Sequence, residues 1–323
     1  GDFEQAAEYM GTAVEIDPLW LVPNSNLVRN LADSGRFDEA REIFDRLRPF
    51  HENSAAFHAM EGEIVQMTGR LADAYRALRQ AYELSPDTPS IGQRYAFAMV
   101  TLQAFQEAVD NVPPQFAPLK NFVTGEWDTA LPQLRAAIDA NPSNLILHFI
   151  YTGGAAYTGD FEGIADVYDT HIRSPEWFED AGVPSVVYGY IEAMTALGRD
   201  DDRDELLQVA IAGLAEREAR GGSNADYYDD VATVEALRGD FDAAFVALEK
   251  AIDSGARYAF WQYETALAPV MRDPRMTALR RLYLDAINAE RAKLGWEPVV
   301  EVGILIEPQQ GGPGIAEPPR PVL

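Results

Sequence analysis

The fold of this chain is decided by residues 69–86, which read Gly-Arg-Leu-Ala-Asp-Ala-Tyr-Arg-Ala-Leu-Arg-Gln-Ala-Tyr-Glu-Leu-Ser-Pro. Ala74, Leu78 and Ala81 are spaced at i, i+4 and i+7, so they lie on one face of a helix. The small alanines allow a neighbouring helix to approach closely, and Leu78 fills the space between them. Proline cannot continue a helix, so Pro86 marks its end. The stretch therefore predicts a helix that packs against another through a face of small side chains.

The same pattern recurs along the chain. It opens with a glycine that is followed two residues later by an aromatic residue, Leu or Asp, and these glycines are Gly1, Gly35, Gly69, Gly125, Gly159, Gly198 and Gly239. Gln103 takes the place of a further glycine, because Phe105 and Ala108 keep the phase. Most starts are 34 residues apart, and the last two intervals are 39 and 41. A period near 34 is typical of stacked helix pairs, so we expect an all-α solenoid.

These residues closely resemble the second helix and turn of the tetratricopeptide repeat. Gly62 and Ala193 match small positions of its first helix, whereas the typical Trp and Leu-Gly pair are mostly absent. The resemblance covers about residues 1–255 and implies a right-handed superhelix of seven or eight helix hairpins. Between residues 103 and 125 the period shortens to 22 and prolines crowd the next first helix. We expect a short helix and a change of curvature there.

The C-terminal region departs from the repeat. Asp273 and Pro274 are typical of a helix start, and a stripe of apolar residues follows up to Gly295. We therefore expect a capping helix at about 274–294 that completes a solenoid over residues 1–295. Residues 296–323 are rich in Pro and Gly and predict an extended tail. We expect this tail to pack against the solenoid of its own chain or of a neighbour.

The composition excludes several classes of protein. The 323 residues are 47% hydrophobic, which is enough to form a core and excludes disorder over most of the length. The chain has 52 acidic and 26 basic residues, and the net charge of −26 opposes direct binding of nucleic acid or anionic lipid. This charge is interpreted either as a solvated surface or as a means of steering a basic partner. The absence of cysteine excludes disulfides and thiolate chemistry. No apolar run is long enough to span a bilayer.

Motifs of catalysis are not found in the sequence. The four histidines are not at metal-ligand spacing, and there is no nucleophile elbow, phosphate loop or dinucleotide-binding motif. The acidic run Asp200–Asp202 lacks the glycine and the closing glutamate of a calcium loop, so we interpret it as the acidic start of a helix. We expect no catalytic site, metal or cofactor, and a protein that is not an enzyme.

A partner-binding groove is implied by the family resemblance. In tetratricopeptide proteins the first helices line the concave face, and their phase places there Phe97, Val100, Leu119, Phe122, Phe149, Tyr157 and Tyr188. A variety of the family binds C-terminal carboxylates through Lys, Arg and Asn. Here Arg29 is the sole such residue, and Glu63, Glu192, Asp226 and Asp229 occupy other inner positions. We therefore expect a protein or peptide with an apolar segment, or the chain's own tail, as the ligand. The alternative is that several of these aromatic residues pack between helices.

The expected function is that of a non-catalytic protein- or peptide-binding scaffold. The chain starts in mid-repeat at Gly1, so we expect it to belong to a longer protein. The segment Met271–Leu279 resembles the end of tetratricopeptide regions appended to bacterial winged-helix regulators and adenylate cyclases. We therefore expect the partner-sensing part of a bacterial regulator, in the cytoplasm or the periplasm. The alternatives are a regulatory module of an enzyme such as an adenylate cyclase, or a structural assembly factor.

Overall fold

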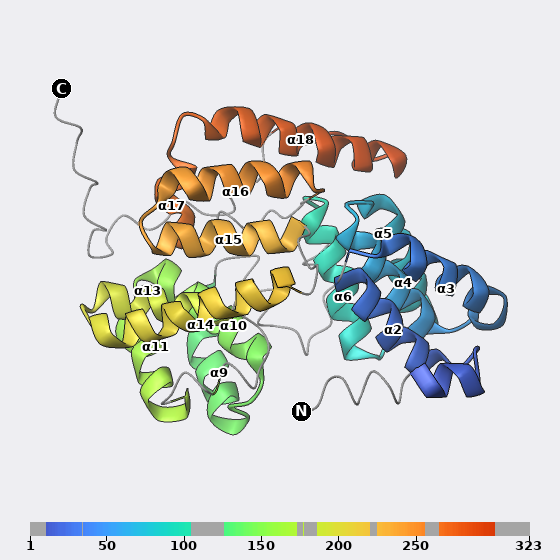
Figure 1. The fold of residues 1–323 in the computed structure, drawn as a ribbon, viewed down its shortest axis with the longest axis horizontal. Coiled ribbons are helices and arrows are strands. Elements are labelled where there is room, and N and C mark those ends of the chain that lie inside the picture. Colours follow the sequence, from blue (N-terminus) through green and yellow to red (C-terminus); the bar gives the residue numbers. More distant parts are fainter. Residues whose placement is uncertain are drawn as a thin grey trace.

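The computed structural model describes residues 11–33, 35–104, 126–172, 177, 186–219, 225–255 and 265–300. The regular elements in these ranges are all helical, and most pair into antiparallel hairpins that stack side by side (Figure 1). The first helices of the hairpins are α2 (Leu21–Asp33), α4 (Ala55–Met67), α6 (Pro89–Thr101), α10 (Leu145–Thr158), α13 (Tyr188–Ala196) and α15 (Ala225–Leu237). The second helices are α3 (Phe37–His51), α5 (Leu71–Leu84), α9 (Trp127–Ala140), α11 (Phe161–Val167), α14 (Asp200–Ala219) and α16 (Phe241–Asp253). A π-helical turn, η2 (Tyr168–Ile172), extends α11, and η5 (Thr265–Leu267), α17 (Ala268–Met271) and α18 (Met276–Lys293) follow α16.

The repeat glycines set the turn inside each hairpin. Gly35, Gly69, Gly159 and Gly239 have φ angles of 71°, 74°, 79° and 80°, in the left-handed region that favours glycine. Each is followed two residues later by the first residue of a second helix. Gln103 has a φ of 58°, so it adopts the conformation of the glycine that it replaces. The predicted repeat and its helical fold class are confirmed.

Small residues bring the helices together as the pattern predicts. Ala74, Leu78 and Ala81 are at most 1% exposed. A Cβ atom on Gly62 of α4 would come within 2.5 Å of Leu78 Cγ, and one on Gly154 of α10 within 2.4 Å of the Trp127 ring. These distances are shorter than van der Waals contact, so glycine is required at both positions for the observed packing.

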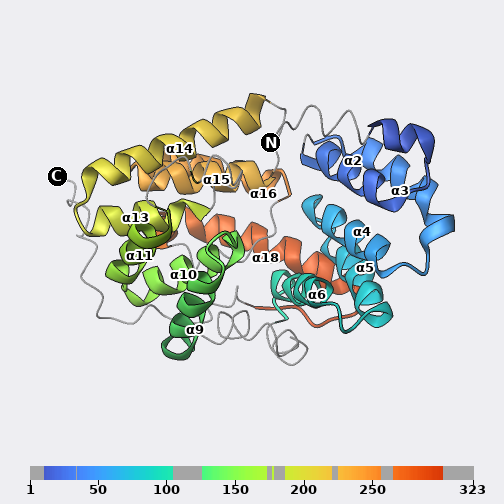
Figure 2. The same cartoon turned by 90° about the horizontal axis from the view of Figure 1, so that it is seen from below.

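The first helices form the inner wall of the stack. α4 contacts both α2 and α6, and α13 contacts both α10 and α15. In the described part of the chain no two second helices contact each other to the same extent. Helices at a smaller radius lie closer together, so the first helices are inside and the second helices outside. Figure 2, a view from below, shows the two groups, α2–α6 and α9–α16, and α18 running from one to the other.

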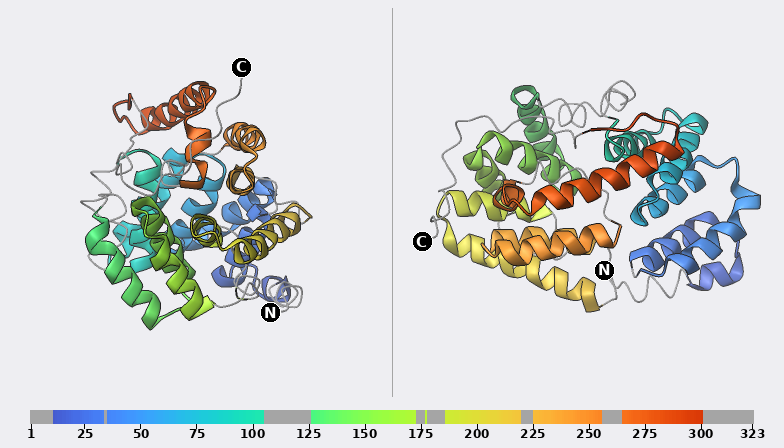
Figure 3. Two further views of the ribbon diagram at one scale, coloured as in Figure 1. Left: turned by 90° about the vertical axis from the view of Figure 1, so that its left-hand side faces the viewer. Right: turned by 90° about the horizontal axis from the view of Figure 1, so that it is seen from above.

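The C-terminal helix joins the two groups. Glu290 Oε2 accepts a hydrogen bond from Ala72 N at 2.9 Å, and Arg291 Nη1 donates to Leu102 O at 2.6 Å. The rings of Tyr75 and Trp296 meet edge to face with centroids 4.9 Å apart. One core cluster joins residues of α5, α6, α15, α16 and α18. Figure 3 shows, from above, how α18 reaches from α16 to α5.

The boundaries of this last helix differ slightly from the prediction. α18 begins at Met276 and not at Pro274, because Asp273 Oδ1 accepts from Arg275 N at 2.8 Å and holds a turn before the helix. Met276, Leu279, Tyr283 and Ile287 are buried, as the apolar stripe predicts. The expected short helix and change of curvature before Gly125 lie outside the described residues, as do residues 301–323 of the tail. Among the described helices none is sufficiently long and apolar to cross a membrane.

Candidate functional site

Three charged residues cross the inner wall at the N-terminal end. Glu63 of α4 pairs with Arg29 of α2 at 2.7 Å and with Arg94 of α6 at 3.3 Å. The three side chains are 52%, 29% and 40% exposed, in the order Arg29, Glu63 and Arg94. The sequence placed Arg29 and Glu63 on this wall but missed Arg94, although Arg94 lies one helical turn before Phe97 and shares its side of the helix. These two ion pairs form a ladder, Arg29–Glu63–Arg94, which links three consecutive first helices and is open to solvent.

The predicted groove residues differ in their exposure. Phe149 on α10 is 45% exposed, and Phe97 on α6 is half-buried. Val100 is 1% exposed and belongs to the core cluster around α5 and α18. Tyr157 is buried with its ring centroid 6.4 Å from that of Trp127. Tyr188 is also buried, whereas Leu119 and Phe122 lie outside the described residues. That these residues line one groove stays a prediction, and Phe97 and Phe149 are the described members that a partner could reach.

A segment of the chain itself lies against the inner wall of the second group of hairpins. The turn η5 contacts α10 and α15, and its Leu267 is fully buried. Thr265 Oγ1 donates to Glu192 Oε2 on α13 at 2.6 Å. Burial raises the pKa of Glu192 to about 7, and the hydrogen bond from Thr265 acts in the opposite direction. Glu192, a predicted inner residue, therefore binds the side chain of Thr265 in another segment of the same chain.

A second polar contact holds the neighbouring helices of this wall. Tyr188 Oη donates to Asp230 Oδ1 at 3.1 Å, and Arg217 Nη1 donates to Asp230 Oδ2 at 2.7 Å. The contact joins α13, α14 and α15. Burial raises the pKa of Asp230 to about 6, while the charge of Arg217 and the hydrogen bond from Tyr188 oppose that rise. Tyr188 thus serves to connect helices.

Comparison with known proteins agrees with this geometry. A family model described as a tetratricopeptide repeat matches residues 1–64. The hairpins with left-handed turn glycines continue the same unit through the rest of the described chain. The described part of the chain is an all-helical stack of tetratricopeptide-like helix hairpins, and the family model itself matches only its N-terminal part. No curated protein matches the chain.

The solved structures that are similar to this chain are distant from it in sequence. The Cut9–Hcn1 hetero-tetramer of the APC/C matches 89% of the chain with 13% identity and a TM-score of 0.47. The present chain spans only 52% of that one. YrrB, a TPR protein with an unusual peptide-binding site, matches 76% of the chain and is covered to 92%, with 14% identity and a TM-score of 0.28. A tetratricopeptide repeat protein from Parabacteroides merdae matches 84% and is covered to 93%, with 13% identity and a TM-score of 0.32.

All four histidines have structural partners. His51 Nε2 lies 2.8 Å from Leu19 O, and His58 Nε2 lies 2.7 Å from Glu52 O, so both rings hold loops. His148 contacts the Tyr190 hydroxyl at 2.6 Å, and burial lowers its pKa. His171 Nε2 contacts Asp139 at 2.7 Å on the outside. Within the described ranges, no three His, Asp or Glu side chains gather as metal ligands would.

Proposed function

We propose that this protein is a non-catalytic scaffold that binds a protein or peptide segment on the inner side of its first helices. The observation that carries the proposal is the accessible part of that wall, where the Arg29–Glu63–Arg94 ladder lies on the same helices as the half-buried Phe97. An apolar side chain with charged groups beside it suits such a surface, because aromatic anchors and a polar rim are typical of protein interfaces. The exposed Phe149 on α10 supplies a second aromatic anchor.

The test compares two apolar side chains of nearly equal exposure, one on a first helix and one on a second helix. Phe149 on a first helix is 45% exposed, and Val246 on the second helix α16 is 46% exposed. The full chain is immobilised, proteins from its native host are captured, and each is quantified by mass spectrometry. We expect Phe149→Asp to lose the specific partner and Val246→Asp to retain it. Equal capture by both variants would remove the inner wall as the binding surface.

We further propose that this scaffold is the partner-sensing part of a larger bacterial regulatory protein. Support comes from the resemblance of Met271–Leu279 to tetratricopeptide regions of such regulators. In the structure this segment comprises the end of α17, the turn that follows it and the first turn of α18, and Arg280 of α18 donates to Met271 O at 2.8 Å. Reading the gene around the array tests the proposal. A DNA-binding winged helix supports it, and an array encoded as a free-standing protein contradicts it.

A further inference from the structure

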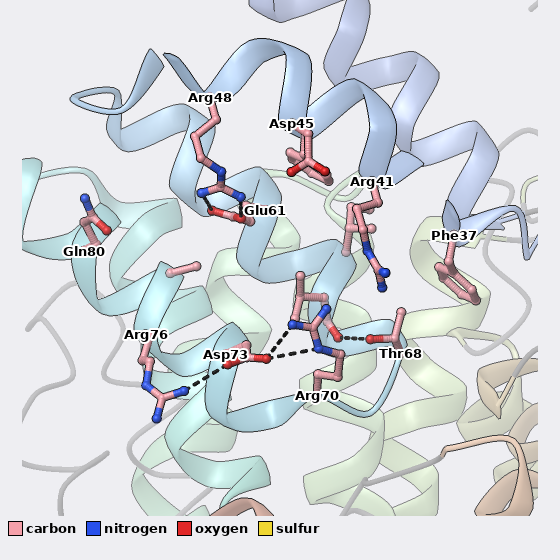
Figure 4. Close-up of a pocket in the computed structure, with 14 residues that line it drawn as sticks. Phe37, Arg41, Asp45, Arg48, Glu61, Thr68, Arg70, Asp73, Arg76 and Gln80 are labelled. Carbon is pink, nitrogen blue, oxygen red and sulfur yellow. Dashed lines mark hydrogen bonds and ion pairs between the residues drawn. The ribbon is translucent and has the colours of Figure 1, made fainter. Parts of the chain in front are cut away.

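A cleft with a basic rim lies on the outer side of the N-terminal hairpins. It has a volume of about 470 Å³, and its walls are α3 and α5 with α4 as the floor. Figure 4 shows the side chains that line it, with Arg41 and Arg48 on the α3 wall and Arg70 and Arg76 on the opposite one. Its volume is within the range of about 300–1,000 Å³ that is usual for ligand sites.

The cleft is separate from the inner wall. Glu61 and Ile64 of α4, together with Thr68 at its C-terminal end, line the cleft, whereas Glu63 pairs with Arg29 and Arg94 on the inner wall. Successive helical residues are rotated by about 100°, so Glu63 points roughly 100–160° away from these three. A ligand in the cleft therefore does not compete directly with a partner on the inner wall.

The charge of the cleft is opposite to that of the chain. Four arginines and three carboxylates, those of Asp45, Glu61 and Asp73, line it, whereas the whole chain has twice as many acidic as basic residues. Arg48 pairs with Glu61, while Arg70 and Arg76 both pair with Asp73 at 2.6 Å and 2.9 Å. Arg41 has no ion-pair partner in the described part of the chain. Its guanidinium points into the space toward Arg70 (Figure 4).

Apolar side chains also line the cleft. Phe44, Ile64 and Ala77 take part in its lining and are 4%, 5% and 9% exposed. A bare inorganic anion would leave this surface uncovered, whereas an apolar side chain would cover it. Arginine binds carboxylates through two parallel hydrogen bonds, so Arg41 and Arg70 suit a carboxylate beside that side chain.

We propose that this cleft binds a peptide segment of a partner protein in which acidic residues flank an apolar side chain. The apolar side chain lies on Phe44, Ile64 and Ala77, and a carboxylate pairs with Arg41. Val299 N donates to Asn288 Oδ1, so the described residues that follow α18 lie against that helix and not in the cleft.

The test is fluorescence anisotropy of the full-length protein with labelled peptides of about ten residues in which Glu and Leu alternate. The net charge of −26 repels such a peptide, so its binding requires a local basic site. The same peptide with Gln in place of every Glu is the neutral control. We expect the acidic peptide to bind at least about tenfold more tightly than the neutral one.

Matched variants locate the binding. Arg41→Glu changes an exposed arginine in the cleft, and Arg281→Glu makes the same change of charge on exposed α18. Ala77→Trp fills the apolar part of the cleft, and circular dichroism verifies that each variant folds. Arg41→Glu and Ala77→Trp are expected to weaken binding by about tenfold or more, with Arg281→Glu and Phe149→Asp close to wild type.

Three results would overturn the proposal. The first is that the acidic peptide binds no better than the neutral one. The second is that the Arg41→Glu and Arg281→Glu variants bind the peptide with equal affinity. The third is that light scattering shows a dimer of the wild type and that Arg41→Glu dissociates it. The last result would assign the cleft to a second copy of the chain. Because Phe149→Asp leaves this assay unchanged, failure here and failure of the inner-wall proposal are distinguishable.

Discussion

Gln103 shows at the residue scale how strongly the hairpin turn is imposed by its surroundings. Its φ of 58° is the only positive value on a non-glycine residue in the described ranges. The left-handed conformation costs a residue with a Cβ roughly 1–2 kcal/mol, so the favourable contacts of the folded chain must outweigh this cost. The sequence identified the position from Phe105 and Ala108 alone, because the phase of the repeat survives the loss of its glycine.

Replacing Gln103 with glycine should therefore stabilise the protein. We expect Gln103→Gly to increase the free energy of unfolding by about 1 kcal/mol in urea denaturation, since glycine adopts this φ without steric cost. Gly239→Ala is the matched reverse change, because a Cβ there would meet nothing within 4 Å and only the φ of 80° opposes it. It should destabilise by a similar amount. A destabilised Gln103→Gly variant would mean that the amide side chain is more important than the backbone.

Glu192 makes stability depend on pH. An unfolded glutamate loses its proton near about pH 4, whereas Glu192 in the folded chain keeps it until about 7. Between these values the folded state binds more protons than the unfolded state. The contribution of this group to stability therefore falls as pH rises, and the loss is complete above about pH 7.

Glu192→Gln should relieve that loss and still accept the hydrogen bond from Thr265. We expect the variant to be more stable than wild type by about 3 kcal/mol near pH 8 and equal to it near pH 4. Thermal unfolding of both proteins across this range measures the difference. A constant difference at every pH would show that the carboxylate does not titrate as described.

At the scale of elements, Glu290 fixes α18 to the start of α5. The side chain of Arg70, which precedes α5, makes no capping hydrogen bond, and Glu290 instead accepts from Ala72 N. The negative charge of the carboxylate also interacts favourably with the partial positive charge at the N-terminus of α5. Lys293 pairs with Glu290 at 2.5 Å and holds it in place. An acidic residue on the last helix thus caps a helix more than two hundred residues earlier.

Glu290→Ala should weaken both helices. We expect a loss of about 1–2 kcal/mol in the free energy of unfolding, together with faster hydrogen exchange at the Ala72 amide. Glu249→Ala removes an exposed carboxylate from α16 and should change neither quantity. If both variants behave alike, the cap contributes nothing beyond its charge.

The starts of the second helices were predictable from the sequence, and their contacts at long range were not. Phe37, Leu71, Phe161 and Phe241 begin helices where the repeat glycines place them. A periodic pattern reports only contacts between neighbouring units, so Glu290 and Trp296 gave no signal of their contacts with α5. Thr265 gave none of its contact with Glu192. The same limit applies to Val100 and Tyr157. Their positions in the helical repeat were compatible either with the groove or with the core.

At the scale of the whole molecule, the negative charge of the surface opposes the compact fold. A net charge of −26 produces self-repulsion that increases as the chain becomes compact. Many surface ion pairs, such as Arg275 with Asp242 at 2.7 Å, reduce it locally. Each such exposed pair contributes little by itself, so the overall repulsion should determine the response to salt.

Added salt should therefore stabilise the protein. Raising the ionic strength from about 0.01 M to about 0.5 M shortens the screening length from roughly 30 Å to less than 10 Å. We expect the melting temperature to rise by roughly 5 °C. Sodium chloride and choline chloride should act equally, because screening depends on ionic strength. A fall in melting temperature would show that ion pairs dominate.

The contact of α18 with α5 also has a mechanical consequence. An open solenoid behaves as a spring, because small rotations between neighbouring units add up along its length. Here the contacts of Glu290, Arg291 and Trp296 join the C-terminal end of the solenoid to α5 and to the end of α6. Stretching must break these contacts first, so the curvature of the inner wall is set before a partner arrives. We therefore expect the protein to resist stretching until these contacts break, and then to extend in a single step.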